Sequence, residues 1–449
     1  MPNIITRGAM SAKALGFTSS TGPQAVYVED VFSTYLYNGN NSTQTITNNI
    51  DLSTKGGLLW IRDRNGASHA LFDTIRGTNS ILSSNTTSAV TINDPGWGIS
   101  SFNTNGWSFA NGSSYVSINN NSTPYVSWAF RKQEKFSDIV SWTGDGVNGR
   151  SIAHNLGSAP GLIIIKRTDT SSNWKAYHTN ANASFLLNTS DPGDSAPVFA
   201  NGYIGGGPTS TQFQVYQYAG SMTDVNASGG TYIAYLYAGS NAGGFGINGT
   251  DSVIACGNFT TDGSGRIGTV TLGWEPQFIL LKSYTNTQGW FIFDTMRGLC
   301  TTAQFYLQPN TSGSEGSYTD STYVYPTATG FGGSANFFGA NNTMIYMAIR
   351  RGPMKVPTDA TKVFLPTNVT SDTTTTTGFP VDWSIAKFTG GADGYATPRL
   401  TNAYMVPNNT NGESGNLSTA INLQSNTSIT YAGIFGGGAR TLYLSLIHI

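Results

Sequence analysis

Charged residues are scarce in this 449-residue sequence. Asp, Glu, Lys and Arg make up 10% of it, against roughly 25% in typical globular proteins. The net charge of −1 offers no basic field to neutralise a phosphate backbone, which argues against nucleic-acid binding. The two cysteines are too few for a disulfide-stapled secreted domain. We interpret Cys256, in an apolar run, as a small buried hydrophobic residue, whereas Cys300 could face either way.

Long apolar segments are also missing. No stretch approaches the ~20 apolar residues that a membrane helix needs, so we expect no membrane partner. Residues 1–7 lack the apolar core of a secretory signal, which predicts synthesis in a cytoplasm. Ala, Leu, Glu and Lys are sparse, which disfavours a helical protein. Aromatic residues reach 12%, too many for a disordered chain.

Glycine, by contrast, is abundant, at 54 residues, and Ser, Thr and Asn fill much of the remainder. This composition is typical of many short strands joined by Gly- and Asn-rich turns, so we predict an all-β protein. Asp-Gly clusters at Asp145, Asp262 and Asp393 suit tight hairpins. A calcium site would need three or four carboxylates where each cluster offers one, so we predict no metal and no cofactor.

An apolar run that ends in a basic residue recurs four times. The four basic residues are 104, 116 and 105 positions apart: Arg62, Lys166, Lys282 and Lys387. Downstream segments repeat in step: 70–77 with 291–298; 81–86 with 185–189, 306–311 and 404–410; and 125–130 with 232–237 and 344–349. A period of roughly 105–115 residues is the size of one sandwich domain, far above that of solenoid repeats.

These landmarks predict tandem antiparallel β-sandwich domains, arranged as beads on a string. The expected boundaries are 28–133, 134–245, 246–352 and a partial copy at 353–443, after a separate N-terminal segment at 1–27. The linkers are not of low complexity apart from 373–377, so the beads could pack on each other. We find no closing strand in the fourth copy, unless residues 430–435 form a displaced one. Residues 444–449 match a translated sequencing adapter, so we expect an artefact there and a metagenomic fragment.

Four segments resemble a family of phage structural proteins that carry a repeated domain of unknown function: residues 4–17, 57–77, 123–132 and 154–166. The resemblance covers nearly the whole chain to about Tyr443. It implies a virion protein of marine or environmental phages, often a tail fibre, with concanavalin-like, jelly-roll or lectin-like domains. Other virion tail proteins are the implied partners. The resemblance leaves the oligomeric state open, although homotrimers are common among such fibres.

Two charged pairs recur in the first and third copies, Asp73 with Arg76 and Asp294 with Arg297. Each could be a carboxylate held by a guanidinium in a binding or hydrolytic site. Each could instead be an ion pair that pins a loop onto the sandwich. Because both pairs occur in copies of one domain, we favour the structural role. The second copy departs from the pattern, with His178 in place of the Asp.

Aromatic residues after polar loops are the best binding candidates. Trp174, Trp290 and Tyr177 could stack on a sugar ring, or the tryptophans could cap the sandwich core, which we prefer. No histidine position keeps His between copies, whereas a metal or triad site needs convergent ligands. We therefore predict no catalytic residue.

We expect a non-enzymatic virion structural protein, a tail fibre or tail accessory that forms an extended arm. Residues 1–27 would attach it, and the repeats would contact the host surface. The alternative is a carbohydrate-binding adhesin that reads a host cell-surface glycan, either for a phage or on a bacterium. A glycan depolymerase ranks third, because the sequence shows no paired-carboxylate cleft.

Overall fold

The computed structural model is all-β, as predicted. It describes residues 25–92, 97–110, 117–181, 183–194, 204–205, 207–217, 223–301, 304–318, 323–352, 354–357, 359–371, 373–388, 394–401, 403–407, 421–431 and 440–445. The helical turns among them are two short 3-10 segments, η1 (Val28–Asp30) and η3 (Ala360–Lys362). Within these ranges no helix is long and apolar enough to cross a membrane. Most of the predicted segment 1–27, and residues 446–449, lie outside the described residues.

The first repeat is a sandwich of a larger and a smaller antiparallel sheet. The larger sheet has the order β1 (Phe32–Asn38), β9 (Pro124–Arg131), β3 (Gly57–Asp63), β4 (Ala70–Asp73), β5 (Gly77–Leu82) and β6 (Thr91–Ile92). The smaller sheet has the order β2 (Thr45–Thr47), β8 (Gly106–Phe109) and β7 (Ile99–Asn103).

The second and third repeats use the same topology. In the second repeat, the larger sheet has the order β10 (Ser137–Thr143), β17 (Thr231–Ala238), β12 (Pro160–Arg167), β13 (Lys175–His178) and β14 (Ser184–Leu186). Its smaller sheet has the order β11 (Arg150–Ala153), β16 (Gln212–Val215) and β15 (Ile204–Gly205). In the third repeat, the larger sheet has the order β18 (Ile254–Thr260), β26 (Thr343–Arg350), β20 (Pro276–Ser283) and β21 (Trp290–Asp294). Its smaller sheet has the order β19 (Ile267–Thr271), β25 (Gly330–Gly333) and β24 (Tyr325–Thr327). A separate hairpin joins β22 (Gln304–Tyr306) to β23 (Gly316–Tyr318).

The fourth repeat has a closing strand, contrary to our expectation. Its larger sheet runs β27 (Phe364–Val369), β33 (Arg440–Ser445), β29 (Trp383–Phe388), β30 (Gly394–Pro398), so β33 lies where β9, β17 and β26 lie. The smaller sheet runs β28 (Thr374–Thr376), β32 (Ser428–Tyr431), β31 (Ile421–Asn422), so Thr430 and Tyr431 of the expected displaced strand belong to it instead. Leu444, inside the expected artefact, is fully buried in β33.

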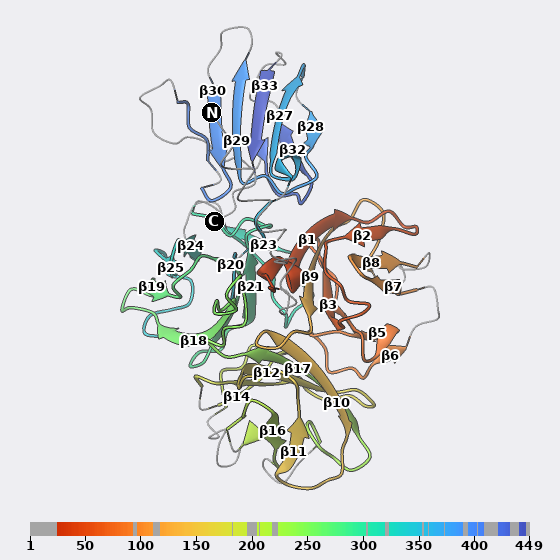
Figure 1. Ribbon diagram of the computed structural model, residues 1–449. Coiled ribbons are helices and arrows are strands. Elements are labelled where there is room, and N and C mark those ends of the chain that lie inside the picture. The colour runs from red at the N-terminus through yellow and green to blue at the C-terminus, as the bar shows by residue number, and fades with distance from the viewer. Residues whose placement is uncertain are drawn as a thin grey trace, which may run out of the picture.

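The first three repeats pack on each other, the arrangement that their linkers left open, and are not separate beads on a string. Their larger sheets face one another across a single hydrophobic core that contains Phe130, Tyr237 and Phe278, one residue from each repeat. The ring of Phe130 lies 5.3 Å from that of Tyr237 and 5.9 Å from that of Phe278. The three repeats cluster in Figure 1, and the fourth stands at one end with its own core. Buried on both faces, β3, β12 and β20 are the continuous apolar runs of the sequence.

Candidate functional site

The marker basic residues of the first three repeats occupy one equivalent position. Arg62, Lys166 and Lys282 lie opposite Val126, Ile233 and Ile345 of the respective closing strands. All three side chains are buried, at 0–1% exposure. Lys387 has the same place in the fourth repeat but is exposed. The marker is therefore buried only where a neighbouring repeat covers it.

Each buried marker donates to a carbonyl of the neighbouring repeat. Lys166 Nζ donates to the Thr87 carbonyl of the first repeat at 2.8 Å. Lys282 Nζ donates to the Ser190 carbonyl of the second at 3.1 Å. Arg62 of the first repeat completes the set by donating to the Gly313 carbonyl of the third repeat. Burial lowers the pKa of both lysines to about 8. The three repeats thus form a closed ring with an approximate threefold relation.

The tryptophans considered as candidates for sugar stacking also contact the neighbouring repeat. Trp174 Nε1 donates to the Ser83 carbonyl of the first repeat at 3.1 Å, and Trp290 Nε1 to the Leu186 carbonyl of the second at 2.9 Å. Trp174, Trp290 and Tyr177 are 0%, 2% and 3% exposed. None of these rings reaches solvent to stack on a sugar, and both tryptophans lie in the core, the alternative preferred from the sequence. The first repeat has His69 at this position, with Nε2 3.0 Å from the Gln308 carbonyl of the third.

The two predicted ion pairs are formed, and each carboxylate also meets the next repeat. Arg76 Nε lies 2.6 Å from Asp73 Oδ2, which also accepts from the hydroxyl of Tyr235 in the second repeat at 2.8 Å. Asp73 is fully buried, so no substrate reaches the carboxylate. This set of contacts defines the 1–2 seam.

The equivalent pair in the third repeat is buried more deeply. Arg297 Nε lies 2.6 Å from Asp294, and both side chains are 0% exposed. Trp128 Nε1 of the first repeat donates to Asp294 at 3.1 Å, and the Arg297 guanidinium lies 5.3 Å from the Trp128 ring centroid. A second carboxylate, Glu315, binds Arg297 Nη1 at 3.0 Å. These contacts define the 3–1 seam.

His178, which departs from the pattern, makes the equivalent contact at the 2–3 seam. Its Nε2 lies 2.9 Å from the Tyr346 carbonyl of the third repeat, and burial lowers its pKa to about 4. The receiving residues Trp128 and Tyr235 were not among the site residues predicted from the sequence. The signal was available, because both occupy the same place in the aligned closing strands.

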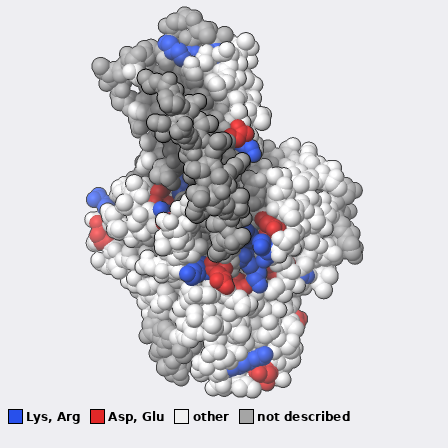
Figure 2. Space-filling model, in the orientation of Figure 1, with Lys and Arg blue, Asp and Glu red and all other residues white. Residues whose placement is uncertain are grey.

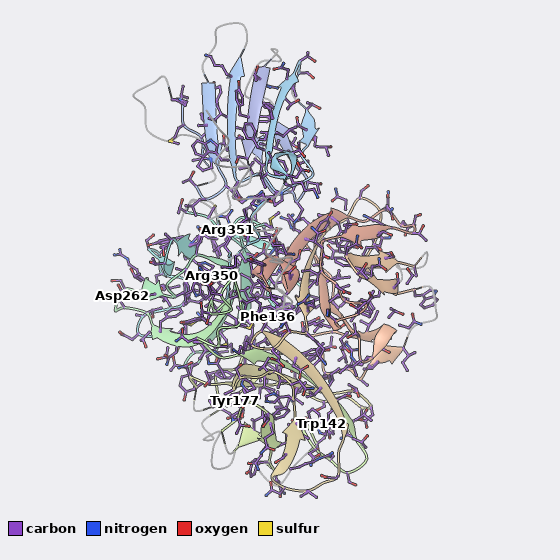
Figure 3. All side chains as sticks on the ribbon, in the orientation of Figure 1. Phe136, Trp142, Tyr177, Asp262, Arg350 and Arg351 are labelled. Carbon is purple, nitrogen blue, oxygen red and sulfur yellow. The ribbon has the colours of Figure 1, made fainter. Side chains whose placement is uncertain are left out.

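The fourth repeat sits over the 3–1 seam through polar contacts. Asn426 accepts from the Leu36 N–H at 2.9 Å and donates to the Thr34 carbonyl at 3.0 Å, both on β1. Gln424 donates to the Arg297 carbonyl at 3.1 Å. Arg351, labelled in Figure 3, bridges Glu275 of the third repeat at 2.9 Å and Asp382 of the fourth at 2.5 Å.

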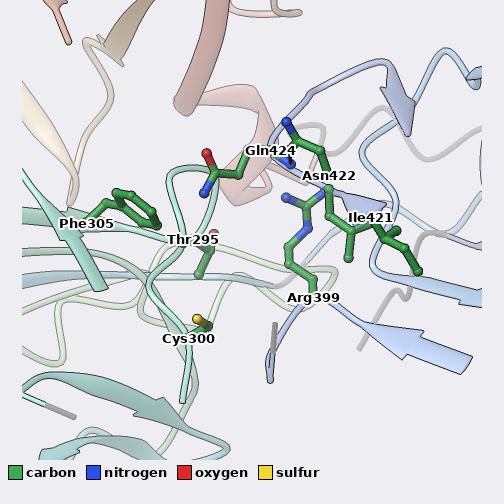
Figure 4. A pocket seen from close by; sticks show the side chains of 9 residues that line it. Thr295, Cys300, Phe305, Arg399, Ile421, Asn422 and Gln424 are labelled. Carbon is green, nitrogen blue, oxygen red and sulfur yellow. Dashed lines mark hydrogen bonds between the residues drawn. The ribbon is translucent and has the colours of Figure 1, made fainter. Parts of the chain in front are cut away.

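A cavity of about 70 Å³ lies where the third and fourth repeats meet (Figure 4). Thr295 and Phe305 line it from one side, and Arg399, Ile421 and Gln424 from the other. The Arg399 guanidinium is already bound to the Val381 carbonyl at 2.8 Å. Small-molecule sites usually enclose roughly 300–1,000 Å³, so this cavity suits a few water molecules.

The remaining candidates are turns and buried residues. Asp145 accepts from the Val147 N–H and Asp262 from the Ser264 N–H, each as a turn carboxylate, while Asp393 lies outside the described residues. No group of three possible metal ligands occurs within the described ranges. Cys256 is buried, as predicted, and so is Cys300. On the face in Figure 2, charged atoms are few and the two signs lie in mixed groups.

Residues 28–353 match the model of a family described as a domain of unknown function, DUF7483. The chain belongs to this family. The matched range covers the three repeats of the ring and ends where the fourth repeat begins, so the DUF7483 unit corresponds to the whole ring. No curated protein matches the chain.

Proposed function

We propose that this DUF7483 protein is a structural component of a bacteriophage virion, a tail fibre or tail accessory, and not an enzyme. The observation that carries the proposal is the use of the repeated residues. The basic markers, the Asp–Arg pairs and the tryptophans all serve contacts between repeats. A chain whose recurring polar residues bind its repeats to one another suits a structural building block. The phage assignment itself rests on the resemblance of the four segments given above.

The closed ring changes the proposed shape from an extended arm to a compact unit with one appended repeat. Such a unit would serve as a rigid node between other tail proteins, which are its proposed partners. The proposed location is the virion, with the appended repeat and the ring surface available for contacts with tail proteins or with the host surface.

The genes beside this one on an independently sequenced contig test the proposal. Flanking terminase, portal and tail genes, together with peptides of this chain in purified particles, are the expected result. Flanking secretion or surface-glycan genes would overturn it in favour of the adhesin, whose binding site would then have to lie away from Trp174 and Trp290.

A further inference from the structure

The three seams of the ring share one geometry at their edge strands. By register with the closing strands, Leu36 of β1 and Ser141 of β10 are equivalent, opposite Val126 and Ile233. The ladder bonds Gly39 N–H to the Thr123 carbonyl and Gly144 N–H to the Gly230 carbonyl fix the alternation. In an antiparallel ladder, residues an odd number of positions away turn their N–H and C=O outward. The N–H groups of Leu36 and Ser141 therefore both point away from their sheets.

At the 3–1 seam this outward edge is occupied. The turn at residues 424–426 of the fourth repeat takes the Leu36 N–H through Asn426. Gln424 accepts from Arg64 Nη2 at 3.3 Å and donates to the Arg297 carbonyl. Together with the Thr34 carbonyl, which accepts from Asn426, four positions of the ring thus hold one amide-bearing turn.

At the 2–3 seam, hydrogen bonds between the second and third repeats occupy the outward edge of β18. The Ser240 hydroxyl donates to the Cys256 carbonyl at 2.8 Å and accepts from the Cys256 N–H at 3.1 Å. Asn258, the counterpart of Leu36, reaches the Asn180 carbonyl at 3.5 Å.

The 1–2 seam is an open groove of about 440 Å³. Its lining contains the counterparts of three of the four positions that hold the turn at the 3–1 seam: Ser141 for Leu36, Arg76 for Arg297 and Thr168 for Arg64. Ile75 is 43% exposed there. Trp142 and Tyr232 are 8% and 1% exposed, too buried to offer ring faces to a sugar.

The groove lining carries little charge, and this matches an uncharged occupant. Its polar lining consists of Ser and Thr hydroxyls: Ser141, Thr143, Thr168 and Thr231. The single charged side chain, Arg76, is paired with Asp73. Strongly charged ligands would find no complement here.

We propose that the 1–2 groove docks a partner protein that inserts an uncharged turn carrying an Asn or Gln side chain, as the fourth repeat does at the 3–1 seam. The turn's amide pairs with the outward N–H of Ser141 and with the carbonyl of Ile139, which also accepts from Lys132 Nζ at 3.4 Å. This site does not depend on the proposed function and would exist equally in an adhesin.

The test uses the full-length protein and a head-to-tail cyclised peptide of residues 421–431, with a diazirine replacing the Ser425 side chain. After photolysis, mass spectrometry locates the cross-links. We expect them at Ile75, Thr143 and Thr168, with competition by excess unlabelled peptide. A matched peptide with Gln424→Ala and Asn426→Ala should cross-link about tenfold less, since it lacks both amides that make the hydrogen bonds.

Protein variants separate this site from chance contact. Ser141→Pro removes the outward N–H without breaking a ladder bond and should lower the yield several-fold, whereas Ser141→Ala keeps that N–H and should leave the yield unchanged. Thr168→Arg supplies the counterpart of Arg64 and should raise the yield. Unchanged melting temperatures confirm that the variants fold.

Three outcomes overturn the proposal. The first is equal labelling of the Ser141→Pro and Ser141→Ala proteins. The second is labelling at Leu36 and Arg297 alone, which would mean that the peptide displaces the fourth repeat. The third is saturable binding to a glycan library that Ser141→Pro abolishes, which would make the groove a sugar site.

Discussion

Replacing Arg297 by Met tests whether the three repeats unfold as one body. The Arg297 guanidinium binds Asp294 at 2.6 Å, Glu315 at 3.0 Å and the Ile292 carbonyl at 2.9 Å, with no exposure to solvent. Met keeps most of the side-chain volume but leaves the buried Asp294 without its cation, while Glu315 keeps Arg64 at 2.6 Å. Breaking a buried pair in this way costs about 3–5 kcal/mol.

The size of the melting shift depends on how much of the chain melts together. The unfolding entropy is about 2.1 cal/mol/K per residue, or about 0.7 kcal/mol/K for the family unit of residues 28–353. A loss of about 4 kcal/mol then lowers the melting temperature of the whole ring by about 6 °C. If each repeat of roughly 105 residues melted alone, one transition among several would fall by about 18 °C.

Differential scanning calorimetry distinguishes these outcomes. We expect one ring transition that moves as a whole in the Arg297→Met protein. Arg76→Met is the matched variant, and its shift should be smaller, since Arg76 binds one carboxylate and keeps 9% side-chain exposure. A large fall confined to one of several transitions would refute the shared core as the unit of stability.

Three further predictions follow from the seams. Trp174→Phe removes the bonds to the Ser83 and Thr86 carbonyls, so unfolding in urea should become easier by about 1–3 kcal/mol, and any glycan binding should stay unchanged. Because burial lowers the pKa of His178 to about 4, its neutral form stabilises the fold fully above the unfolded pKa of about 6.5. That contribution is lost as pH falls toward 4, and urea midpoints of His178→Gln against wild type should converge over this window. The double substitution Gln424→Ala and Asn426→Ala should release the fourth repeat and enlarge the radius of gyration in X-ray scattering. A lowered melting temperature of the ring would contradict this role of the two amides.

The sequence predicted the strands well because their signals are local. The apolar run Leu162–Ile165 and the turn at Asp262 each fold as their own residues dictate. It could not predict the ring, because burial on the second face of a sheet depends on residues in another repeat. Trp290 follows a polar loop and so resembled an exposed residue, yet its indole N–H bonds a carbonyl 104 positions away.

Ring closure also explains why the fourth repeat resembles the others and yet stands apart. Each ring repeat offers a basic marker and a closing strand to one neighbour, and carbonyls and an Asp or His to the other. Three copies satisfy all these groups, so a fourth has no free seam of this kind. Accordingly Lys387 is exposed, and Pro398 stands at the register position of Asp294. The residue that distinguishes a ring member is thus the seam Asp or His and not the shared basic marker. In other members of the family, the number of copies that carry both the basic marker and the seam Asp or His should equal the number of repeats in the ring.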